Sequence, residues 1–481
     1  MNKNKKKFLN KKQRFILTFI GNIVYSIGIF LPFGIGQYSV YITSYLHHYN
    51  SKVNLHFGNL MMPILILFLC LSAPIGGILE RKFGMKLSLI INSIILELLM
   101  FLFISITNIW LIFLTIILMG ISLGTVIAIP EKNICYYYPA KRGIIIAIYS
   151  SINTIIGSFM SVLGEKIINP KKIVLNDGEI FYPLNVAKNY FKFYKLGLVM
   201  LPICSLVSTI LIQKYIPENE ENKLVKNSAK SDDEKIAYSK NIKAAVCNNR
   251  IWKIAYISIF SQFAFGFLVS SFRVYGALIS INGALMQYAP LFFGISQIIF
   301  GPLWGYINDK FQSYKVVKII CLIFIFHSII ISIFIQSNII YIISLFIGSI
   351  INIGINSITR PYLMKIYGMK YIIEIGGVIT ICVGIINILK GGLSVLISMY
   401  YKTGKELQIP YRIIAIIGIG LNMMAYIFAS KEKDEPFIYP FELNNENKID
   451  ISSNIDNNMS GNIKITKIDE YDVKVNNDNK L

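Results

Sequence analysis

The chain has 481 residues, of which 54% are hydrophobic and 15% are charged, whereas soluble domains carry about 25% charged residues. The basic residues behind its net charge of +21 lie in the N-terminal tail, short loops and polar linkers. They do not form the basic patch that would indicate a nucleic-acid-binding domain. This composition excludes an ordinary soluble globular protein. Apolar runs of about 20 residues recur along the chain, and each can cross a hydrocarbon core of roughly 30 Å.

Twelve membrane helices are predicted, arranged as two six-helix halves, 15–214 and 254–430, of an all-α polytopic membrane protein. A basic tail, 1–14, precedes the first helix, which is too long for a cleaved signal peptide. A polar, lysine-rich linker, 215–253, separates the halves, and the Asn- and Lys-rich tail, 431–481, is expected to be disordered. The predicted spans are 15–42, 57–79, 87–107, 109–129, 143–165, 193–214, 254–281, 285–307, 316–336, 338–361, 372–400 and 411–430.

The turns after helices two and eight, 77–86 and 305–314, look like copies of one another. A second matched pair follows them, Tyr138-Pro-Ala-Lys141 and Tyr367-Gly-Met-Lys370. Their spacing is nearly equal, because 57 positions (141 − 84) separate the first two turns and 58 (370 − 312) the second two. Duplicated basic loops between apolar segments are typical of secondary transporters. The candidate gating residues in these turns are Gly77, Lys82, Gly84, Asp309, Lys310, Lys141 and Arg142.

The distribution of lysine and arginine predicts the orientation in the membrane. The loops after helices two, four, eight and ten are basic, whereas those after helices three, seven and nine hold no lysine or arginine. A longer loop after helix five is an exception, with Lys171, Lys172 and Lys188. We therefore expect both termini and the linker to be cytoplasmic.

Several polar or charged residues fall inside predicted helices. Gln37 and Tyr38 in helix one bring hydrogen-bonding groups to an expected cavity, and Glu97 in helix three is a candidate for proton coupling, although we favour a structural ion pair. Arg273 in helix seven either binds substrate or extends to the interface. Arg360, near the cytoplasmic end of helix ten, is expected to be a gate or interface charge.

Lys390 lies near the middle of helix eleven, where an ammonium group costs about 2.5–3.5 kcal/mol to insert. A charge held there normally faces a cavity or an anionic partner. The following Gly391 and Gly392 allow a helix or a substrate to approach closely. Lys390 is therefore the strongest candidate for substrate binding, the alternative being a structural pair with an acid such as Glu97.

This arrangement resembles the major facilitator superfamily, whose loop pattern is Gly-x-x-x-Asp-Arg/Lys-x-Gly-x-Arg/Lys. The first turn places Arg81 where the family has Asp, and the second has Gln312 in place of a glycine. The stretch from Tyr138 to Gly143 is similar to the aromatic-Pro-x-Lys-Arg-Gly loop of the oxalate/formate antiporter and monocarboxylate-porter branch. Lys390 matches that branch's substrate-binding lysine, whereas Gly301 stands where the branch has an arginine.

The resemblance implies a monomeric secondary transporter without cofactor that moves small organic anions across a lipid bilayer. Monocarboxylates are expected, because the second binding cation of the branch is missing. Transport would proceed by alternating access, either with protons or by exchange. Lys390 would neutralise the carboxylate, and Arg273 would assist from the outer side.

Two alternatives remain open at this point. One is a transporter of a neutral or zwitterionic solute, such as an amino acid, sugar or drug, with Lys390 balanced internally by Glu97. The other is a non-transporting membrane sensor or scaffold. An enzyme is not expected, because no nucleophile arrangement or phosphate loop occurs and the six cysteines and four histidines form no metal-ligand set.

Overall fold

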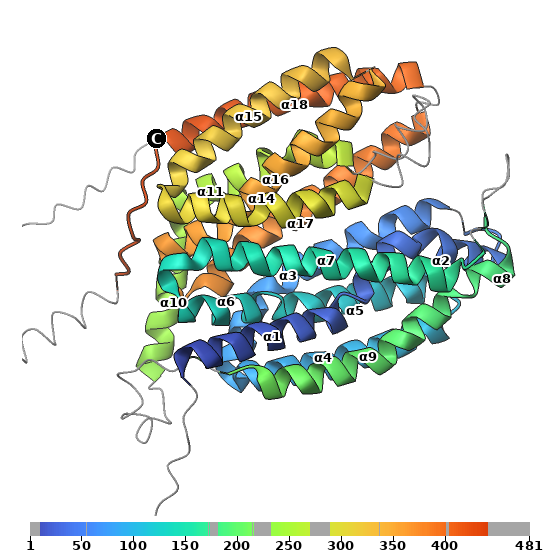
Figure 1. Cartoon of the computed structure of the whole chain (residues 1–481), viewed down its shortest axis with the longest axis horizontal. Coiled ribbons are helices and arrows are strands. Elements are labelled where there is room, and N and C mark those ends of the chain that lie inside the picture. Colours follow the sequence, from blue (N-terminus) through green and yellow to red (C-terminus); the bar gives the residue numbers. More distant parts are fainter. Residues whose placement is uncertain are drawn as a thin grey trace, which may run out of the picture.

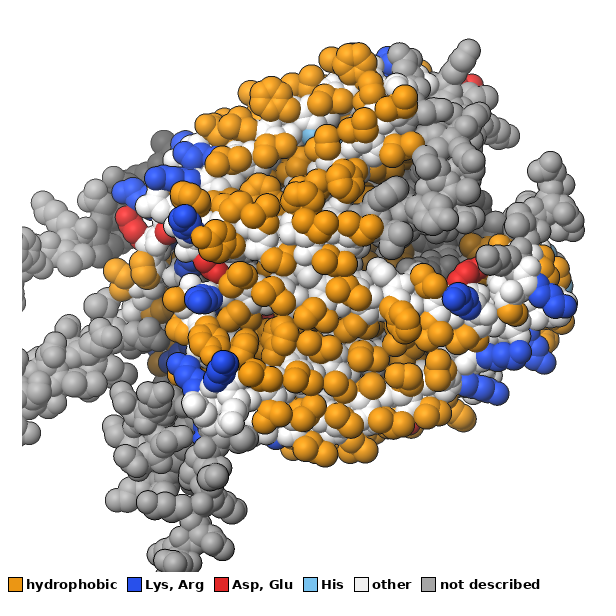
Figure 2. All heavy atoms as spheres, viewed as in Figure 1, with side chains coloured by type: hydrophobic (Ala, Val, Ile, Leu, Met, Phe, Trp, Pro, Cys, Tyr) orange, Lys and Arg blue, Asp and Glu red, His pale blue; other side chains and the backbone are white. Residues whose placement is uncertain are grey.

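The computed structural model describes residues 10–53, 55–171, 173, 181–213, 215, 232–269, 289–335, 337–400 and 404–440. Over these ranges the chain is helical apart from turns and short connections, and the helices run side by side along one elongated bundle (Figure 1). Ten of the described helices are long and apolar enough to cross a membrane. Figure 2 shows hydrophobic side chains over the middle of the visible face, with lysine and arginine near its two ends. The expected membrane-spanning, all-helical architecture is confirmed.

The first half contains two interrupted spans. The expected helix 15–42 is divided into α1 and α2 by a single 3-10 turn, Pro32–Gly34, and α5 gives way to α6 at Ile127. A proline lies at or close after each interruption, where its missing N–H removes one helix hydrogen bond; Pro130 removes the bond to Val126. The helices are α1 (Lys11–Ile29), α2 (Ile35–Tyr49), α3 (Leu55–Phe83), α4 (Met85–Ser105), α5 (Ile109–Val126), α6 (Ala128–Tyr137), α7 (Arg142–Ile168), α8 (Leu184–Ala187) and α9 (Tyr190–Leu211).

The second half begins after a helix that lies within the predicted linker. This linker helix, α10 (Asp232–Cys247), packs against α11 and α17. We call the end of the bundle that carries α10 the linker end (Figure 1). The other described helices are α11 (Asn249–Phe260), α14 (Ala289–Lys310), α15 (Ser313–Phe334), α16 (Asn338–Tyr367), α17 (Ile372–Tyr400) and α18 (Gly404–Ser430).

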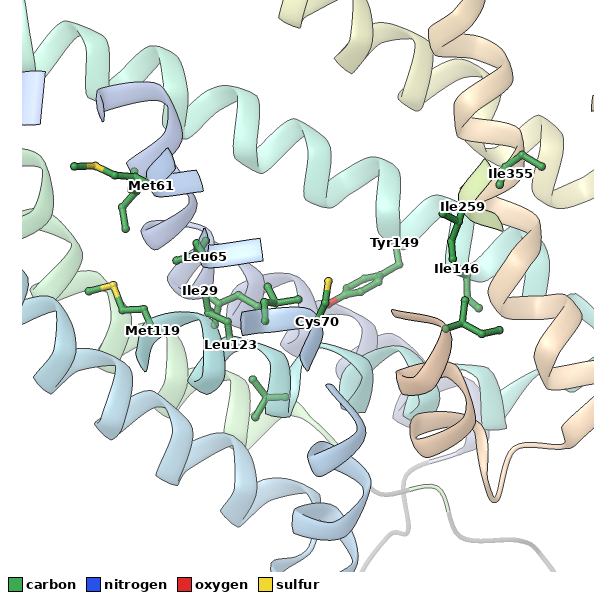
Figure 3. Packing of buried hydrophobic residues seen from close by; sticks show 14 of the residues in the cluster. Ile29, Met61, Leu65, Cys70, Met119, Leu123, Ile146, Tyr149, Ile259 and Ile355 are labelled. Atoms are coloured by element: carbon green, nitrogen blue, oxygen red, sulfur yellow. The ribbon is translucent and has the colours of Figure 1, made fainter. Parts of the chain in front are cut away.

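The halves meet along two helix pairs, α3 with α17 and α7 with α14. On α17, three glycines at seven-residue spacing lie against α3, and a Cβ atom added to Gly377 or Gly384 would be 2.7 Å from Pro74 or 2.5 Å from Cys70. Such small residues let two helix backbones approach closely. Buried hydrophobic residues also join the halves, and in Figure 3 Ile146 of α7 lies beside residues of the second half.

Residues 431–440 pack on the linker end of the second half, which corrects the prediction that the whole tail from 431 is disordered. The Tyr439 side chain is 6% exposed, and its hydroxyl donates to the Tyr367 carbonyl at 2.8 Å. The Phe437 N–H donates to the Ile366 carbonyl at 2.7 Å. The two aromatic residues supply apolar surface that the average composition of the tail concealed. We call this segment the C-terminal strap.

Candidate functional site

Lys390 of α17 is 8% exposed, and it faces the chain segment that continues from α11. A Cβ atom added to Gly266 would lie 2.7 Å from the Lys390 Nζ atom, so the glycine leaves room for the ammonium group. No hydrogen bond or ion pair to Lys390 occurs among the residues that the structure describes. A membrane-embedded cation without a protein partner is suited to bind an anionic ligand.

An amide pair lies one helical turn from Gly266, the glycine that Lys390 faces. The Gly266 N–H donates to the Gln262 carbonyl at 2.8 Å, which places Gln262 one helical turn away. The Gln262 Nε2 atom is 3.4 Å from the Asn356 Oδ1 atom on α16. One turn farther along, the hydroxyls of Ser258 and Thr359 are 3.1 Å apart. Sequence reasoning missed these groups, because uncharged polar residues give little signal within an apolar helix.

Of the other predicted binding residues, Tyr38 alone has a side chain in the described part of the chain, and it contacts α7. Tyr38 is 1% exposed, and its hydroxyl donates to the backbone carbonyls of Met160 at 3.1 Å and Ser161 at 2.8 Å on α7. Tyr38 therefore packs between α2 and α7 in this structure, and its role in binding stays a prediction. Gln37 lies on α2, but its side chain is outside the described part, and Arg273 is outside the described residues altogether.

Glu97 lies on α4, which packs against α5 and α9 of its own half. Within the described residues it forms no ion pair with Lys390, so the pairing proposed in one alternative is not found. Because α4 packs against helices of the first half, Glu97 lies in a different part of the bundle from Lys390 on α17. Its role in proton coupling stays a prediction.

Asp309 connects the two halves at the linker end. Its Oδ1 and Oδ2 atoms accept the backbone N–H groups of Gly143 and Ile144, both at 2.9 Å, at the start of α7. A carboxylate at this position satisfies unpaired N–H groups and interacts favourably with the helix dipole. Arg142 extends the contact by donating to the Met364 carbonyl of α16 at 3.3 Å.

Arg81 takes the corresponding place in the first copy of the turn, but with the opposite charge. Its guanidinium pairs with Glu374, which lies in the first turn of α17. A Cβ atom added to Gly77 would overlap the Glu374 carboxylate, so the glycine leaves room for the carboxylate in its present position. The ion pair accounts for the departure at Arg81: a cation repels a helix N-terminus, and the glutamate lies between them. Sequence analysis missed Glu374.

A third link joins α16 to α6, where Arg360 pairs with Glu131. This contact supports the expectation that Arg360 is an interface charge, and it identifies a second acid that sequence analysis missed. Within α3 and α6, the neighbouring Lys132 pairs with Glu80 at 2.7 Å and so strengthens the first half. The described ionic contacts between the halves therefore gather near the linker end.

The candidate gating residues that remain are one glycine and three lysines. Gly84 precedes α4 with a φ of +78°, a conformation that glycine adopts without strain. The lysines of the turns are exposed, and none pairs with an acid across the halves in the described part of the chain; they are Lys82, Lys141 and Lys310.

The chain matches a family model, that of the Major Facilitator Superfamily, over residues 15–391. It is similar to the solved transporter FucP in its outward conformation, with a TM-score of 0.58, 13% identity and coverage of 86% of this chain and 99% of that chain. It is also similar to the proton:xylose symporter XylE bound to 6-bromo-6-deoxy-D-glucose, with a TM-score of 0.62, 12% identity and coverage of 91% and 98%. Comparison with curated protein sequences gives no match.

Proposed function

Because the chain belongs to the Major Facilitator Superfamily, and so is a transporter rather than an enzyme, we propose that it moves small organic anions, above all monocarboxylates, across a membrane. The observation that carries this proposal is Lys390, a buried ammonium group in a membrane helix with no partner among the described residues. A bound carboxylate would supply the missing charge. It would thereby offset part of the free-energy cost of burying the cation.

A single ammonium group suits a ligand with one carboxylate. On α14, Gly301 packs against α7, since an added Cβ atom would lie 2.9 Å from the Ser151 Oγ atom. That position therefore supplies no second cation for a dicarboxylate such as oxalate. The Gln262–Asn356 amide pair supplies neutral hydrogen-bonding groups instead, which fits an oxygen atom elsewhere on the ligand.

The contacts between the halves support a transport cycle by alternating access. In this structure Asp309, Arg81 and Arg360 join the halves near the linker end. We infer that these contacts keep that end closed while the ligand reaches Lys390 from the opposite end. Rocking of the halves would then break the contacts and release the ligand on the linker side, which the distribution of lysine and arginine predicts to be cytoplasmic.

Uptake by reconstituted vesicles tests the proposal. Labelled lactate and formate are expected to enter, oxalate is expected to enter poorly, and Lys390→Gln is expected to lower uptake at least tenfold. Lys315→Gln, a change at an exposed lysine, is the matched control and should leave uptake unchanged. Absence of transport for all three acids, or normal uptake by Lys390→Gln, would contradict the proposal. Dependence on a pH gradient indicates proton symport, and dependence on internal substrate indicates exchange.

A neutral polar solute, such as a sugar, is the second candidate. The Gln262–Asn356 amide pair, one helical turn from Gly266, favours it, because amide groups bind hydroxyl groups well. Similar solved structures include a fucose:proton and a xylose:proton symporter. Uptake of labelled monosaccharides by the same vesicles, with no uptake of monocarboxylates, would establish this candidate in place of the first.

A further inference from the structure

The linker helix contributes one side chain to the contact between the halves. The ring of Tyr238 on α10 lies 4.0 Å from the Arg81 guanidinium carbon. The Tyr238 hydroxyl accepts a hydrogen bond from Arg81 at 2.5 Å and donates to the Lys370 carbonyl at 3.1 Å. Burial raises the pKa of Tyr238 to about 12, although Arg81 lowers it, so the hydroxyl keeps its proton at neutral pH. Tyr238 therefore joins Arg81 of the first half to the turn that precedes α17.

Tyr238 packs against a row of tilted aromatic rings. Tyr371, the residue before α17, lies between Tyr238 and Tyr439, and its ring centroid is 4.8 Å from that of Tyr238 and 4.5 Å from that of Tyr439. The Asn241 Nδ2 atom of α10 donates to the Tyr371 hydroxyl at 3.1 Å. Tyr371 is buried between these two rings, which leaves it little freedom to move. The strap, the turn before α17 and the linker helix thus form one packed unit.

The C-terminal strap is fixed to the second half by charged side chains. Asp434 accepts the Ser313 N–H at 2.7 Å and thereby caps the start of α15. Glu432 pairs with Arg250 at 2.9 Å and with Lys253 at 3.0 Å, close to the start of α11. These contacts all lie within the second half, so they do not have to break when the halves separate.

We propose that the linker helix and the C-terminal strap form a brace that positions Arg81 for its contact with Glu374, with Tyr238 as the positioning residue. This inference rests on the alternating-access function proposed above. The brace moves with the second half, whereas Arg81 belongs to the first, so the Tyr238–Arg81 contact exists only when the linker end is closed. A contact made in one state alone shifts the equilibrium toward that state. Release of the strap would therefore favour opening.

Distances between spin labels test the brace without any substrate. Labels attached at Lys86→Cys on α4 and Lys315→Cys on α15, in a chain without its native cysteines, report the separation of the halves at the linker end. Loss of one cation–π contact and one hydrogen bond in Tyr238→Ala is expected to raise the ratio of open to closed states about tenfold. Tyr439→Ala should change the ratio in the same direction by less, because it acts through Tyr371.

Two further variants complete the test. Tyr306→Ala removes a tyrosine that is 52% exposed on α14 and should leave the distances unchanged. Tyr238→Phe keeps the ring and the packing but loses the hydroxyl, so it covers the case in which the alanine variant does not fold, and a smaller shift toward opening is expected. Distances identical to wild type in folded Tyr238→Ala or Tyr238→Phe would overturn the brace. That result would leave the proposed anion transport intact, since the measurement contains no ligand.

Discussion

Arg81 at the end of α3 and Asp309 at the end of α14 occupy matching turns of the two halves, yet each contacts the start of a helix in the opposite half with opposite charge. Asp309 binds the free N–H groups of α7 directly. Arg81 reaches α17 only through Glu374. The internal duplication has therefore kept the position of the contact while exchanging its charges.

This relationship predicts that a double substitution can give the first turn the arrangement of the second, in which an aspartate caps a helix of the opposite half. Arg81→Asp alone places a carboxylate beside Glu374 and should favour the open linker end and lower uptake about tenfold, because like charges repel. Arg81→Asp combined with Glu374→Ser should recover most of the uptake, since an aspartate can then cap α17 as Asp309 caps α7. Vesicle uptake and label distances measure both effects. Equal loss in the single and double variants would contradict the exchanged-charge interpretation.

Asp309→Ala is expected to weaken the contact with α7 by about 1 kcal/mol, because the cap and its interaction with the helix dipole are lost. Asp309→Asn keeps an acceptor without the charge and should have a smaller effect. The ratio of open to closed states in the label experiment measures the difference. An asparagine variant that opens more than the alanine variant would show that capping is not the basis of this contact.

Gly77→Ala should disrupt the Arg81–Glu374 pair, because the added methyl group occupies the position of the glutamate carboxylate. The expected result is a shift toward the open linker end with little loss of thermal stability. Gly420→Ala is the matched control, since a Cβ atom there meets nothing within 4 Å. A shift of the same size in both variants would indicate a general effect of alanine on helix packing.

Gly266→Val should displace the Lys390 ammonium group, because the added atoms would lie within contact distance of Nζ. We expect KM for the carboxylate to rise about tenfold while the maximal rate changes less, since ground-state binding is affected first. Initial rates of uptake over a range of concentrations separate the two constants. An unchanged KM would place the ligand away from Lys390.

Much of the architecture follows from local features of the chain. The lengths of the apolar runs determine which segments lie in the membrane, and the duplicated turns determine that there are two related halves. The fold class and the assignment as a transporter rather than an enzyme are confirmed by the family match. Lys390 could be identified as a binding candidate from the sequence, because an ammonium group in an apolar helix is costly wherever the helix packs. The substrate class, the orientation and the monomeric state stay predictions.

Only the tertiary structure decided which side chains meet. Glu374 and Glu131 pair with arginines from distant segments of the chain. No local sequence pattern specifies which helices face one another. Tyr38 turned out to bind the backbone of α7, and Glu97 lies on a peripheral helix, because helix orientation depends on packing with neighbours that the sequence does not order. Close approach of α3 and α17 along their glycines brings Arg81 to Glu374. The lengths of the apolar runs thus determined which segments span the membrane, whereas packing between the halves determined which side chains join them.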